Sequence, residues 1–231
     1  MRFYDPEQIS RGIKTQYLGP SPVVREHAET AVLWAADEPV PSRPHVIGKL
    51  TIGPNLLAQA NRALTAEGGF SVYREQHRLD GNLVWAEEIP PSPFLGDFLK
   101  TCAQRFQDVI RQDLLQMMET TDYMITDVLS AGPYSFMDED GWHREDASFK
   151  NLAYSVTANG PVTEFAAGAY RNSDFDEHFF TGRPSPKDVA ASEVGDILVY
   201  DGTSVLNREP MPKFNGHMRL DAFVQVHNVF N

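Results

Sequence analysis

The first indication of the fold comes from residues 194–202, which read VGDILVYDG. They predict a turn at Val194-Gly195 followed by a buried strand. Similar extended runs recur after residue 120, with Gly, Pro, Asn and Asp between them. They are Tyr123–Leu129, Tyr134–Met137, Asn151–Thr157, Thr163–Tyr170, Asp196–Asp201 and Met218–Val226. Short strands at this spacing are typical of a sandwich or barrel-like β core.

The residues before 120 predict helices as well as strands. Residues 54–66 form a helix opened by Pro54 and closed by glycines, and residues 92–119 form a longer helix with one apolar stripe. Two strands are expected between them, Phe70–Arg74 and Asn82–Glu87. Cys102 lies on the apolar stripe, where it predicts a small buried hydrophobe.

These patterns predict how the chain is organised. Residues 1–48 are polar and contain prolines, so they indicate an arm or a linker. We expect one domain over residues 1–231, in which 1–120 form an N-terminal arm and helical support and 121–231 form the β core.

Composition narrows the class of protein. The 231 residues include 32 acidic and 20 basic side chains, and the net charge of -12 disfavours binding to nucleic acid. Cys102 is the only cysteine, which suits a reducing compartment. Neither a signal-peptide core nor an apolar stretch of membrane-spanning length is evident, so we expect a cytoplasmic protein.

The segment Trp142-His143-Arg144-Glu145 is the first candidate for chemistry. In an extended segment His143 and Glu145 project to the same side and could share one divalent metal. A plain surface loop is the simpler interpretation of this pair alone, because short motifs of this kind are common.

The last predicted strand supplies a second candidate. His217, Arg219 and Asp221 fall on one side of it if it is regular. An inward arginine is costly unless it is paired, so Arg219 is either bonded within the protein or placed to bind a carboxylate.

Taken together, residues 122–227 resemble the iron(II)/2-oxoglutarate-dependent oxygenases, most closely the prolyl-hydroxylase-like branch. The resemblance rests on His143 and Glu145, on the strand Gly195–Tyr200 and on Arg219. It implies an α+β, mainly β, double-stranded β-helix, a jelly-roll or cupin-like fold, with N-terminal helices supporting one sheet. It also implies Fe(II) bound by His143 and Glu145, and 2-oxoglutarate bound by Arg219 with help from Tyr134.

Two positions depart from that family. Asn207 stands where the third metal ligand, a histidine, is expected, and its amide oxygen is a weaker ligand than imidazole. His217 could replace it, and His178 is a weaker option. Asp221 stands where the family commonly has Ser or Thr, and it could neutralise Arg219.

The resemblance implies an enzyme, a 2-oxoglutarate-dependent dioxygenase oxidising a small-molecule or amino-acid-like substrate. Two alternatives stay open. One is a non-catalytic β-helix module that binds a small ligand or a protein, which Asn207 and Asp221 favour. The other is a cupin-like enzyme that holds a metal but uses no 2-oxoglutarate. The substrate and the oligomeric state are not predicted.

Overall fold

The structure is a computed structural model of the chain. It describes residues 4–21, 44–66, 71–78, 82–89, 92–115, 123–132, 141–144, 152–166, 174–176, 179–202, 205–208 and 219–228. In several strands, including the last one, the description covers the backbone alone.

The elements follow one another in a mixed order. They are α1 (Pro6–Gly12), β1 (Ile13–Tyr17), β2 (His45–Ile52), α3 (Pro54–Ala66), β3 (Ser71–Arg78), β4 (Leu83–Ile89), α4 (Pro93–Leu115), β5 (Tyr123–Gly132), β6 (Leu152–Asn159), β7 (Glu164–Ala166), β8 (Phe175–Asp176), β9 (Phe179–Phe180), η2 (Pro186–Asp188), β10 (Val189–Ala191), β11 (Asp196–Asp201), β12 (Leu206–Arg208) and β13 (Arg219–Asn228).

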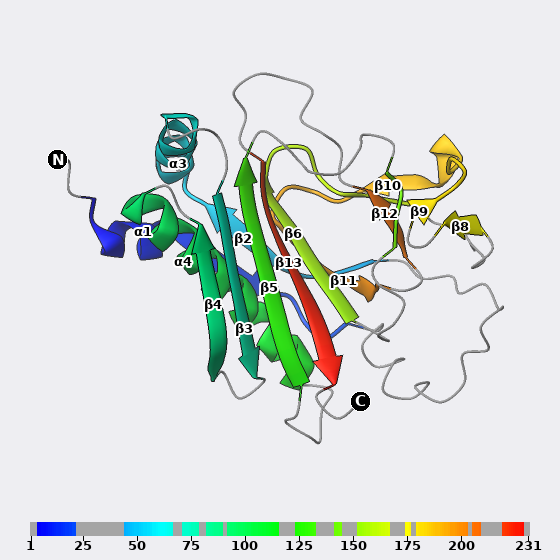
Figure 1. Cartoon of the computed structure of the whole chain (residues 1–231), viewed down its shortest axis with the longest axis horizontal. Coiled ribbons are helices and arrows are strands. Elements are labelled where there is room, and N and C mark those ends of the chain that lie inside the picture. Colours follow the sequence, from blue (N-terminus) through cyan, green and yellow to red (C-terminus); the bar gives the residue numbers. More distant parts are fainter. Residues whose placement is uncertain are drawn as a thin grey trace.

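The strands of the described residues form one large sheet and two small ones (Figure 1). The large sheet has the order β1-β2-β11-β6-β13-β5-β3-β4, and a second sheet has the order β10-β7-β12. Strands β8 and β9 pair with each other. All of these pairs are antiparallel, so the described chain is a mainly antiparallel β fold with few helices.

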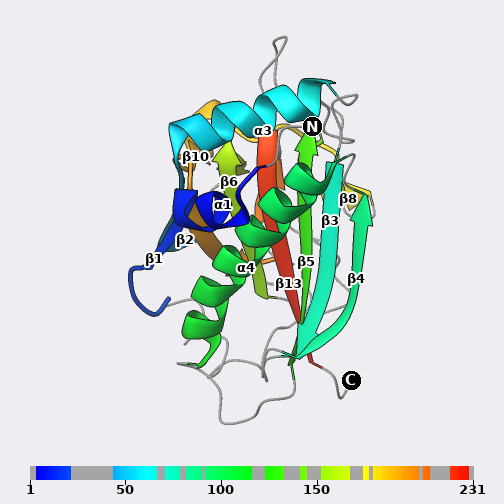
Figure 2. The ribbon, with the colours of Figure 1, turned by 90° about the vertical axis from the view of Figure 1, so that its left-hand side faces the viewer.

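The large sheet is buried on both faces at β11. Ile197 and Val199 belong to the core that contains the apolar side of α4. Leu198 and Tyr200, which alternate with them, belong to a second core. That second core includes Phe165 of β7, so the sheet β10-β7-β12 packs on the face opposite the helices. Figure 2 shows α4 lying across the near face of the large sheet, with β8 and β10 behind it.

A buried carboxylate ties α4 to the sheet. Asp113 is fully buried, and its oxygens accept hydrogen bonds from the hydroxyls of Tyr17 and Tyr154 and from the backbone N–H of Ser21. Burial raises the pKa of Asp113, and these three hydrogen bonds oppose that shift. The contact joins the end of β1, the end of α4 and β6.

The predicted turn before β11 requires its glycine. Gly195 has φ +84°, and a Cβ there would lie 2.2 Å from the backbone oxygen of Leu50. The approach is close because Leu50 donates its N–H to the Gly195 oxygen at 2.7 Å. Gly195 in turn donates to the Thr157 oxygen at 2.8 Å, so this one residue joins β2 to β6.

Several sequence predictions are confirmed. The helix over residues 54–66 and the strand over residues 196–201 have the predicted bounds, and Cys102 is fully buried on α4. The predicted helix over residues 92–119 is observed as Pro93–Leu115. The predicted strand Tyr134–Met137 lies outside the described residues.

The large sheet differs from the sequence prediction in one respect. Four of its strands, β1 to β4, come from before residue 120, where helical support was expected to dominate. Part of the predicted arm is strand, because β1 pairs with β2 along its whole length. Alternate residues of β1 are exposed, so its sequence is polar although Ile13 is fully buried.

None of the helices in the described ranges combines the length and the apolarity that a membrane span requires.

Candidate metal and ligand site

The structure brings together two residues that the sequence predicted as metal ligands. His143 and Asn207 form an isolated antiparallel bridge. Each donates its backbone N–H to the other's carbonyl oxygen, and both distances are 2.8 Å. Residues paired in this way carry their side chains on the same face. The bridge therefore extends the sheet β10-β7-β12 by one segment and sets the imidazole beside the amide.

His143 is held in a defined tautomer. Its side chain is buried, and Nδ1 lies 3.0 Å from the carbonyl oxygen of Gly141. Because a carbonyl oxygen only accepts, Nδ1 donates in this contact, and in a neutral ring Nε2 would be the nitrogen with the lone pair. A histidine that donates one ring N–H to a backbone carbonyl has the usual arrangement of a metal ligand.

Asn207 occupies the middle of this sheet. It pairs with Phe165 of β7 on one side and with His143 on the other. Only 2% of Asn207 is exposed, and within the described residues its Nδ2 has no hydrogen-bond partner. Buried donors without a partner are rare in folded proteins and call for an explanation.

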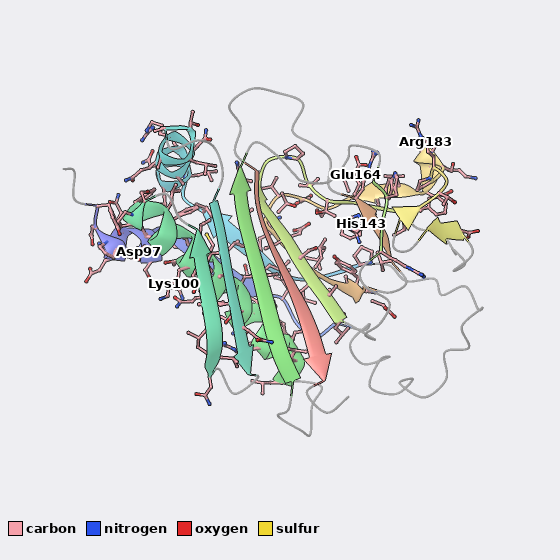
Figure 3. All side chains as sticks on the ribbon, in the orientation of Figure 1. Asp97, Lys100, His143, Glu164 and Arg183 are labelled. Atoms are coloured by element: carbon pink, nitrogen blue, oxygen red, sulfur yellow. The ribbon has the colours of Figure 1, made fainter. Side chains whose placement is uncertain are left out.

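The opposite face of the same sheet is anchored by a charged group. Arg208 binds Glu164 through Nε and Nη2, both 2.6 Å from Oε2, and its guanidinium lies 4.8 Å from the ring centroid of Trp142. Trp142 is buried, and its carbonyl oxygen accepts from the N–H of Phe180. These contacts hold the segment that carries His143, and Figure 3 labels His143 and Glu164 in the same part of the molecule.

The residue after the histidine is partly shielded from water. Arg144 is half-buried, and burial lowers the pKa of its guanidinium. A charged ligand bound nearby would therefore interact more strongly than on an open surface.

Other predicted site residues are placed only in part. Glu145, Tyr134, His178 and His217 lie outside the described residues. Arg219 opens β13.

The backbone of β13 gives the register of its two charged residues. Arg219 stands opposite Gly132 of β5. Asp221 stands between Ser130 of β5 and Thr157 of β6. The expectation that Arg219 binds a carboxylate therefore stays a prediction.

Sequence reasoning missed one residue. Ser155 of β6 is buried, and its hydroxyl has no hydrogen-bond partner among the described residues. A weak signal was present, because Ser155 is a polar residue between the apolar-bearing positions Tyr154 and Val156 of a predicted strand. Its significance depends on which face of the sheet it occupies, and that required the register of β6 with β11.

The donor set fits iron in part. Among the described residues no three His, Cys, Asp or Glu side chains stand close enough to share a metal. His143 fits the role of a nitrogen ligand, and Asn207 beside it can offer an amide oxygen. A metal here would need a third ligand from outside the described residues, such as Glu145.

No protein-family model matches the chain, and no curated protein matches it. EvdO2 from Micromonospora carbonacea var. aurantiaca is 10% identical, with 92% of this chain and 93% of that chain covered and a TM-score of 0.43. The epimerase SnoN, solved with Fe3+, alpha ketoglutarate and nogalamycin RO, is 11% identical, with 97% and 85% covered and a TM-score of 0.40. The Fe(II)/(alpha)ketoglutarate-dependent dioxygenase TqaL is 9% identical, with 96% and 84% covered and a TM-score of 0.35. Because these TM-scores are below 0.5, the likenesses identify neither the fold nor the chemistry of this chain.

Proposed function

We propose that the protein is a non-haem iron(II)/2-oxoglutarate-dependent oxygenase built on a double-stranded β-helix, acting on a small-molecule or amino-acid-like substrate. The observation that carries the proposal is the pairing of His143 with Asn207. Two residues expected to be metal ligands, far apart in the chain, become direct neighbours on one face of a sheet. A surface loop at His143 would not produce a buried imidazole whose Nδ1 lies 3.0 Å from a backbone carbonyl oxygen.

The roles of the residues follow from their chemistry. His143 would bind iron through Nε2, Glu145 through a carboxylate oxygen and Asn207 through its amide oxygen. Arg219, with Tyr134, would bind the far carboxylate of 2-oxoglutarate. Iron with 2-oxoglutarate would supply the oxidising chemistry, and the two packed sheets would keep bulk water away from the reacting atoms.

Asn207 also favours a second candidate, a non-catalytic module that binds a ligand without a metal. The side-chain atom of Asn207 that lacks a hydrogen-bond partner among the described residues is Nδ2, a donor that cannot bind a metal ion. In that case the amide would face a ligand oxygen. The two candidates therefore differ in whether the protein retains iron.

Iron stoichiometry after anaerobic reconstitution and desalting separates them. The parent should retain some iron, and His143→Ala should retain none. Asn207→His should retain more than the parent, because imidazole is the better ligand. Ala190→His is a matched control, since it adds an imidazole to the same sheet at an exposed position of β10. It should leave iron retention unchanged.

Two further measurements complete the test. Adding 2-oxoglutarate to the iron-loaded protein should produce the weak visible band of the iron(II)–2-oxoglutarate complex, followed in air by succinate. Iron retention without that band would indicate a metal enzyme of another kind. If neither the parent nor Asn207→His retains iron, the oxygenase proposal fails and the binding module stands.

A further inference from the structure

Two buried polar side-chain atoms without hydrogen-bond partners, one from each sheet, lie on the faces that the two sheets turn toward each other. Ser155 of β6 is 8% exposed and Asn207 of β12 is 2% exposed. Within the described residues, neither Ser155 Oγ nor Asn207 Nδ2 makes a hydrogen bond. Among the described residues four buried side-chain atoms make no hydrogen bond, and these two are the ones that belong to strands of facing sheets, which suggests a shared cause.

The register of the large sheet places Ser155 on the inner face. Its neighbour Tyr154 points to the helices, because it donates its hydroxyl to Asp113 of α4. Ser155 stands directly opposite Leu198 of β11, and residues opposite each other in a ladder share a face. Leu198 belongs to one buried apolar cluster with Phe165 of the small sheet. Ser155 therefore faces that sheet.

Asn207 reaches the same region from the other side. It stands opposite Phe165 in the ladder between β12 and β7. Phe165 belongs to one core with Leu198, and its ring meets the ring of Tyr200 edge to face with a centroid distance of 5.4 Å. Ser155 is thus paired with Leu198 in the large sheet, and Asn207 is paired with Phe165 in the small sheet. Leu198 and Phe165 belong to the same apolar cluster between the two sheets.

The chemistry of the Asn207 amide and the Ser155 hydroxyl limits which ligand atoms could form hydrogen bonds with them. Nδ2 of an amide only donates, and a hydroxyl can donate to an acceptor placed near it. The matching group is therefore an oxygen acceptor. A carboxylate forms stronger, charge-assisted bonds than a neutral carbonyl. Asp196, two residues before Leu198, would not repel it strongly, because its charge is paired with Lys49 at 2.7 Å.

We propose that Ser155 and Asn207 donate hydrogen bonds to a carboxylate of a small ligand bound between the two sheets, with Ser155 as a binding residue that no motif assigns. The inference rests on the proposed function for its choice of ligand, since either the co-substrate 2-oxoglutarate or an amino-acid-like substrate could supply the carboxylate. It does not depend on iron, because both donors belong to the protein.

The test is calorimetric titration of the full chain, with and without Mn2+ in the buffer. In one arm the probe is 2-oxoglutarate, and in the other it is each L-amino acid in turn at saturating 2-oxoglutarate. Ser155→Ala should weaken binding in one of the arms by about tenfold, the effect expected for one charge-assisted hydrogen bond. Loss in the first arm identifies the co-substrate, and loss in the second arm alone identifies the substrate.

Thr157→Val is the matched control. Thr157 is a buried residue of the same strand, but its hydroxyl lies 3.4 Å from the hydroxyl of Thr163 and is therefore satisfied. The valine variant should bind the probe as the parent does while losing stability, and Ser155→Ala should show the reverse.

Two results would overturn the inference. One is Ser155→Ala binding every probe as tightly as the parent. The other is a parent that binds no probe in either arm. Mn2+-dependent binding that ignores Ser155 would support the proposed function and still reject this inference, so the two failures are distinguishable.

Discussion

Replacing Asn207 with valine should stabilise the ligand-free protein. Its Nδ2 is buried without a partner among the described residues, and such a donor costs about 1–3 kcal/mol of folding free energy. Valine removes the donor and is a good strand former, although its bulk offsets part of the gain. The backbone bonds of Asn207 with His143 are main-chain bonds and persist. We expect a net gain of about 1 kcal/mol.

Urea unfolding measures this change directly. The midpoint should rise with an unchanged slope, and Tm should rise by about 2–4 °C for a chain of this size. Thr157→Val is the comparison, since it removes a hydroxyl that has a partner and should lose about 0.5–1.5 kcal/mol. The same Asn207→Val variant should lose the ligand or metal binding of the parent.

The opposite outcome would refute the reasoning. A loss of more than about 1 kcal/mol with an unchanged slope would mean that the Asn207 amide is satisfied in the folded, ligand-free chain. The amide would then be an ordinary structural group, and the argument for a ligand between the sheets would lose one of its two donors.

Three further predictions concern stability and reactivity. Gly195→Ala should destabilise the fold by more than about 2 kcal/mol in urea, because the new Cβ would clash with Leu50 at a positive φ. Asp113 has a raised pKa in the folded state, so protonation of its carboxyl favours the folded chain. This contribution to the free energy of unfolding is complete below about pH 4, the range of an unfolded aspartate, and is lost as the pH rises through the folded pKa. The free energy of unfolding of the parent relative to Asp113→Asn should therefore decrease with rising pH, and a difference that is independent of pH would contradict this. Burial raises the pKa of Cys102, so a thiol reagent should label it only as fast as the chain unfolds, and rapid labelling of the native protein would contradict its placement.

The amino-acid sequence alone determined the local elements. The apolar pattern of residues 196–201 predicts a buried strand, and the apolar stripe of α4 predicts a helix with one buried face. Neither prediction requires knowing which element packs against it. The turn at Gly195 was also predicted from the sequence, because glycine readily adopts the positive φ that this turn has. His143 was singled out from residue type and spacing, and Asn207 only from its place in the family resemblance, where a histidine was expected.

Tertiary structure decided which residues meet. The sequence could not show that β1 joins the large sheet, because its polar residues are consistent with an arm until its pairing with β2 is known. The bridge between His143 and Asn207 likewise depends on strand register. The isolation of Ser155 Oγ is visible only once both sheets are in place. The physical reason is that propensity and turn chemistry act over a few residues, whereas a ladder of hydrogen bonds joins distant segments, and burial of a polar atom depends on both of its sides.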